Sequence, residues 1–124
     1  MKRSAAATAS EREVGMKITK VEDGFVVMSD GNMTGRRLYE SSGCAIIHMT
    51  VQPGREVAPH AAAVDMEFYV LEGRGRFMVG DESREAGPGS LVESPRNISH
   101  GIVNTGSGPL RLLAIKNNRP SDGL

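Results

Sequence analysis

The chain has 124 residues, enough for one compact core and too few for two. Its fifteen acidic and fifteen basic residues balance, so no strong field attracts nucleic acid or an anionic membrane, and we expect neither as a partner. The single cysteine, Cys44, excludes an intramolecular disulfide, and no apolar run is long enough to cross a bilayer, which together indicate a cytoplasmic protein.

The two ends of the chain are predicted to lie outside the folded domain. Residues 1–13 have a basic start followed by small residues, and their apolar stretch is too short and too weakly hydrophobic for a secretory signal. We expect a disordered tail there, a folded domain over residues 14–118, and a loose tail over residues 119–124.

Between these tails, fifteen glycines and six prolines divide the chain into short apolar segments that carry no helical stripe of period 3.6. Each segment is predicted to be a strand. In chain order they are Lys17 to Val21, Phe25 to Met28, Arg36 to Tyr39, Ala45 to Gln52, Glu67 to Leu71, Gly75 to Val79, Ser83 to Glu85, Ser90 to Glu93, His100 to Asn104 and Leu110 to Lys116.

Short strands with turn signals between them favour an all-β sandwich or barrel, because no helix is available to connect parallel strands. Glu72-Gly73-Arg74-Gly75 separates two apolar segments and is typical of a hairpin whose glycines supply positive φ angles. The sequence therefore predicts an antiparallel architecture.

Two groups of residues stand out by their spacing: the first contains Gly54, His60 and a closing Gly73, and the second contains Gly89, Pro95, His100 and Asn104. These groups resemble the two signature motifs of the cupin family. The resemblance implies a single antiparallel cupin barrel, which is a double-stranded β-helix or jelly roll. Asn97 replaces a glycine of the family pattern, and Asn tolerates the left-handed conformation.

In cupins, two histidines and a glutamate of the first motif and one histidine of the second bind a divalent metal. The resemblance transfers only His60 and His100, because Ala62 and Met66 replace the other two ligands. Protein metal sites usually have three or four protein ligands, so we expect a weak site for Fe, Mn, Ni or Zn, or no metal.

Glu67 is the candidate for the missing carboxylate. Alternation along its strand places Met66 and Phe68 together, facing the pocket, and Glu67 on the other face. A bulge near Asp65 would rotate Glu67 inward, and without one Glu67 is a solvated outer-face residue.

His48 is a further pocket candidate. It shares a face with Thr50 and Gln52, while Ile47 and Met49 share the opposite face. A polar face of this kind lies in solvent or lines a polar lumen, and we favour solvent.

Three function classes remain open at this stage. The protein is predicted to bind or transform a small organic molecule, with a divalent metal held by His60 and His100. The alternatives are a metal-free ligand-binding or sensing module that has lost catalysis, and metal-free acid/base catalysis by one of the two histidines. Whether the protein is an enzyme is left undecided. We also expect a homodimer, because open sheet edges need cover.

Overall fold

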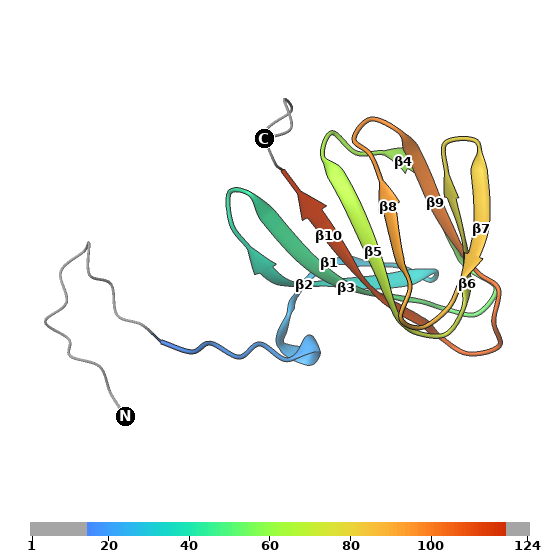
Figure 1. The fold of residues 1–124 in the computed structure, drawn as a ribbon. Helices are drawn as coiled ribbons and strands as arrows, with labels where there is room; N and C mark the ends of the chain where they lie inside the picture. Colours follow the sequence, from blue (N-terminus) through green and yellow to red (C-terminus); the bar gives the residue numbers. More distant parts are fainter. Residues whose placement is uncertain (1–14, 119–124) are drawn as a thin grey trace, which may run out of the picture.

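The computed structural model describes residues 15–118, so the two predicted tails lie outside the described residues. The described chain forms two antiparallel sheets packed face to face (Figure 1). The six-stranded sheet contains, in spatial order, β1 (Phe25–Ser29), β2 (Met33–Glu40), β3 (Cys44–Val51), β10 (Leu110–Asn117), β5 (Asp65–Glu72) and β8 (Leu91–Ser94). The four-stranded sheet contains β4 (Glu56–Ala61), β9 (Ser99–Asn104), β6 (Gly75–Val79) and β7 (Glu82–Ala86).

Every pair of neighbouring strands is antiparallel, which confirms the predicted all-β fold class. From β3 onward the chain passes repeatedly from one sheet to the other, as expected for a jelly roll. The two sheets face each other without a backbone ladder between them in the described chain, so the barrel closes by side-chain packing.

One predicted strand is absent from the structure, and one observed strand was not predicted. Residues 17–20 form no strand, and Val21–Asp23 is a 3-10 turn, labelled η2, that precedes β1. Strand β4 was not predicted, because Pro59 interrupts its apolar pattern. The register of β4 against β9 is irregular between Val57 and His60, around Pro59, which is where a strand tolerates proline.

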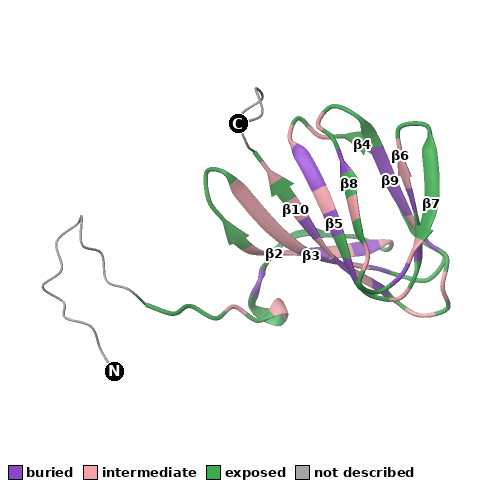
Figure 2. Ribbon diagram, viewed as in Figure 1, coloured by how far each residue is buried: buried purple, intermediate pink, exposed green. Residues whose placement is uncertain are grey.

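Buried residues lie on strands of both sheets (Figure 2), and their side chains form the hydrophobic core. Its fully buried members include Val51, Val70, Leu110 and Leu112, which lie together where β3 ends and β10 begins. At that end the Asn104 amide donates hydrogen bonds to the carbonyl oxygens of Val51 and Gly108, each at 2.9 Å. This end of the lumen is therefore closed, and the other end is left for a ligand.

Gly73 and Asn97 adopt the left-handed backbone conformation predicted for them, whereas Gly75, for which a positive φ was also predicted, does not. Gly73 has a φ of 85° in the β5–β6 hairpin, and a Cβ there would collide with the Pro109 carbonyl oxygen. Asn97 has a φ of 65° and is the one non-glycine residue with positive φ in residues 15–118. It therefore adopts the left-handed conformation at a position where the family pattern has a glycine.

Candidate functional site

The structure brings His60 and His100 together at the open end of the lumen. They are register partners on β4 and β9, and their ring centroids lie 4.7 Å apart in an edge-to-face arrangement. Phe68 of the opposite sheet contacts His100 edge to face, with ring centroids 5.2 Å apart. His100 is buried, whereas His60 is exposed at the mouth. The two motif histidines thus form one cluster.

Hydrogen bonds orient both imidazole rings. Nδ1 of His60 lies 3.0 Å from the Ala58 carbonyl oxygen, which can only accept, so this nitrogen carries the proton and a neutral ring has its lone pair on Nε2. Nδ1 of His100 lies 3.0 Å from the Ser94 hydroxyl, and both residues are buried. Each ring therefore has its Nε2 free of described protein partners.

Burial lowers the pKa of His100 below its usual value of 6.5, and the neighbouring His60 lowers it further. A lowered pKa keeps His100 neutral at pH 7. At the centre of the site, this ring is consequently a hydrogen-bonding group without a charge.

A cavity of about 310 Å³ lies below the histidines, inside the sandwich. Its walls are mostly apolar, with polar groups at the histidines and at the rim. The lining residues are Val27, Met28, Met33, Gly35, Arg37, Glu40, Ala45, Ile47, Met49, Val57, His60, Met66, Phe68, His100, Ile102, Ala114 and Lys116. Mostly apolar walls with a few polar groups are typical of small-molecule sites.

Met66 and Phe68 line this cavity, as expected from the alternation along β5. Glu67 lies on the opposite face of the strand, where its register neighbours are Ile115 and Glu93. The irregularity between β5 and β10 lies at the far end of the strand, next to Glu72. No bulge turns Glu67 toward the histidines, so the carboxylate is on the wrong side of the sheet to join them.

His48 also lies outside the cavity, on the outward face of the six-stranded sheet. The predicted solvent exposure of His48 is wrong, because its exposed fraction is only 3%. Its register neighbours are Arg36 and Leu113, so long side chains on the outer face are placed to cover it, which the polar pattern did not reveal. The Nε2 atom of His48 is buried and has no hydrogen-bond partner in the described structure.

The residues present do not fit a resident divalent metal. Within residues 15–118, no group of three or more His, Cys, Asp or Glu side chains lies close enough together to bind one. Two imidazoles and the soft Met66 thioether fall short of the three nitrogen or oxygen ligands that Fe, Mn, Ni or Zn sites normally have.

Three residues of the site escaped the sequence reasoning. Ser94 ends the edge strand β8, and its hydroxyl holds His100. Arg37 and Lys116 line the mouth. Lys116 could have been found, because it continues the inward alternation of Leu112 and Ala114 along β10.

A larger hollow of about 550 Å³ lies on the open side of the sandwich, between β7 and β8. It is lined by apolar residues such as Phe77, Leu91 and Ile98 and by exposed charged residues such as Glu82, Arg84 and Glu93, and it contains no histidine. We place the candidate site in the smaller cavity, where converging polar groups meet apolar walls.

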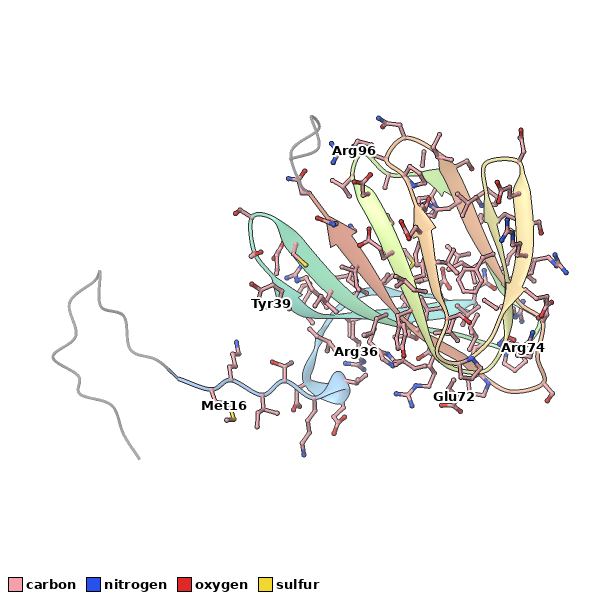
Figure 3. All side chains as sticks on the ribbon, in the orientation of Figure 1. Met16, Arg36, Tyr39, Glu72, Arg74 and Arg96 are labelled. Carbon is pink, nitrogen blue, oxygen red and sulfur yellow. The ribbon has the colours of Figure 1, made fainter. Side chains whose placement is uncertain are left out.

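Arg96 marks the open end of the sandwich in Figure 3, whereas Glu72 and Arg74 mark the closed end. The Arg96 backbone N–H donates to the Asp65 carboxylate at 2.9 Å, and its side chain forms an ion pair with the same group at 3.4 Å. Asp65 therefore anchors the loop between β8 and β9 to the start of β5, close to His100.

Solved structures share this fold. An RmlC-like cupin from Shewanella frigidimarina is 17% identical, with a TM-score of 0.74 over 89% of this chain and 97% of that one. The polyketide cyclase RemF from Streptomyces resistomycificus is 24% identical, with a TM-score of 0.72 over 85% and 81%. KdgF from Halomonas sp. is 17% identical, with a TM-score of 0.72 over 83% and 95%. At these identities the likeness shows the fold alone.

A search of curated proteins finds no match to this chain. No helix in the described residues is long and apolar enough to cross a membrane. The family model described as a cupin domain matches residues 47–116, which is more than half of the chain and includes both motifs. This protein therefore belongs to the cupin family.

Proposed function

We propose that this protein binds a small organic molecule in the lumen between its sheets without a resident metal. The observation that carries the proposal is the pair of oriented imidazoles in a cavity of about 310 Å³ whose walls are mostly apolar. Fixed polar groups on apolar walls orient a ligand and make binding selective. The fold shared with a protein named as a polyketide cyclase supports an organic ligand.

We propose binding without a metal because the site has too few metal-binding side chains. His60 and His100 supply two nitrogen donors, and the positions of the other two family ligands are held by Ala62 and Met66. A site this incomplete binds a divalent metal weakly, so the ligand has to be held by hydrogen bonds and apolar contact.

Chemical transformation of the ligand is the second candidate function. The Nε2 lone pair of His60 favours it, because a neutral imidazole at the cavity mouth accepts a proton from a bound molecule. Such a reaction would have a pH profile that changes in His60→Gln, whereas a binding module has no turnover to lose.

A pair of matched variants tests where ligands bind. Ala45 lines the cavity at its rim, and Ile46 lies next to it on the opposite face of β3. We expect small organic fragments found by ligand-observed NMR to lose binding in Ala45→Phe, which narrows the lumen, and to keep it in Ile46→Phe. Fragments that bind both variants equally well would contradict a site in the lumen.

The assembly and location are also part of this proposal. Strand β1 is an edge strand, and its apolar residues Phe25, Val26, Val27 and Met28 are all exposed. An exposed apolar edge supports a homodimer formed through β1. The free thiol of Cys44 and the balanced charge support a cytoplasmic protein that does not bind nucleic acid.

A further inference from the structure

The mouth of the lumen has a cationic rim that the two histidines do not explain. Lys116 is the last inward-facing residue of β10, above Leu112 and Ala114, and it lines the cavity. Its register neighbours are Met66 on β5 and Ala45 on β3, and neither of them carries a charge. The Lys116 ammonium group thus belongs to the lumen side of the sheet.

The charges at this rim do not cancel. Arg37 forms an ion pair with Glu40 at 3.5 Å, and its guanidinium lies 4.9 Å above the ring of Phe25. By contrast, none of the ion pairs within residues 15–118 includes Lys116. Arg37, Glu40 and Lys116 together therefore give the lining one unbalanced positive charge.

Polarity changes with depth below this rim. His60 is exposed at the mouth like Lys116, whereas His100 is buried, and both rings offer Nε2 atoms for hydrogen bonds. Below them the walls are formed by apolar side chains such as Met49, Phe68 and Ile102. A molecule that fits this arrangement has an apolar body, a hydrogen-bonding group near one end and a single negative charge at that end.

We propose that the ligand is a small amphipathic carboxylate, with its hydrocarbon part in the lumen and its carboxylate at the rim beside Lys116. This inference rests on the proposed function and adds the chemical class of the ligand. The cavity volume of about 310 Å³ is at the lower end of the range for ligand sites, so the ligand is compact. One unbalanced positive charge matches a monoanion and leaves a dianion partly unpaired.

Three probes with the same ring and different charges test the inference: phenylacetate, phenylacetamide and 2-phenylethylammonium. Their affinities are measured by titration calorimetry at pH 7 and low ionic strength, where a partly exposed ion pair is least screened. We expect phenylacetate to bind about fivefold more tightly than phenylacetamide, and 2-phenylethylammonium to bind least well.

The variant Lys116→Gln should reduce the preference for phenylacetate over phenylacetamide to less than about twofold. Lys20→Gln is the matched control, because Lys20 precedes the η2 turn and does not line the cavity. It should leave the preference unchanged. Ala45→Phe should remove phenylacetate binding, and thermal melting of each variant checks that it is folded.

Three results would overturn the carboxylate inference. They are equal or tighter binding of the amide or the ammonium compound, a preference that survives in Lys116→Gln, and no binding of phenylacetate. None of these removes the proposed function, which the fragment screen tests separately and which fails if that screen yields no ligand that Ala45→Phe excludes.

Discussion

The role of each buried histidine depends on which face of its strand it occupies. His100 is buried and held by Ser94, whereas His48 is equally buried on the outer face with its Nε2 unpaired. The sequence identified the two motif histidines through the spacing of the motifs. It could not foresee the burial of His48, because that burial depends on how β2 and the sequence-distant strand β10 pair with β3 on both sides of it.

His48 and His100 make stability depend on pH. Burial lowers both pKa values below 6.5, and Arg111 further lowers that of His48 while His60 further lowers that of His100. The unfolded chain then binds more protons than the folded chain as the pH falls through 6.5. The free energy of unfolding should be constant above that value and decrease below it, by at most about 1.4 kcal/mol per pH unit for each histidine.

The variant His48→Met removes one of these two titrations, so its stability loss between pH 7 and pH 5 should be smaller than that of the wild type. Urea denaturation at several pH values measures the difference. An unchanged pH dependence in His48→Met would show that His48 is not held in its neutral form.

Ala62 and Met66 give a second prediction at the residue scale. Ala62 packs against the core, and Met66 lines the cavity. The double variant Ala62→His and Met66→Glu should supply four ligands and bind Zn²⁺ or Mn²⁺ about stoichiometrically, whereas the wild type should retain little metal after chelation. Elemental analysis after reloading measures both. Stoichiometric metal in the wild type, lost in His60→Ala, would contradict the metal-free account.

At the scale of elements, the sequence predicted the turns and strand faces that depend only on neighbouring residues. The β5–β6 hairpin follows from its glycines, and the inward set of β5 follows from alternation. Strand β4 did not follow, because Pro59 hides it, and Lys17 to Val21 resembled a strand although it finds no partner. Partners in a sheet come from the whole fold, which a local pattern does not encode.

Two glycines with similar backbone angles test this description of the hairpin. Gly73 has a φ of 85° and Gly54 a φ of 75°, but only at Gly73 would a Cβ collide with another part of the chain. Gly54→Ala should cost about 1 to 2 kcal/mol from its conformation alone. Gly73→Ala should cost at least about 2 kcal/mol more, measured by urea denaturation. Equal costs would contradict the packing of Pro109 against this turn.

At the scale of the whole molecule, the sandwich is open at its edges. Phe25 of β1 has an exposed fraction of 64%, and the three apolar residues that follow are at least 40% exposed. An apolar edge strand of this kind favours pairing with a second copy.

We expect light scattering after size-exclusion chromatography to show a dimer, and Val26→Lys to shift it toward the monomer, because a charged edge opposes strand pairing. Leu91→Lys is the control, since Leu91 is exposed on β8 at the other edge of the same sheet. A monomeric wild type, or a dimer broken only by Leu91→Lys, would contradict pairing through β1.

The most direct test of the account is backbone and histidine-ring NMR of chelated protein titrated with a fragment ligand. Metal-free binding in the lumen predicts shifts at Ile47, Phe68 and Ile102 and at the Nε2 atoms of His60 and His100. Binding that needs added metal, or shifts confined to the hollow between β7 and β8, would contradict it.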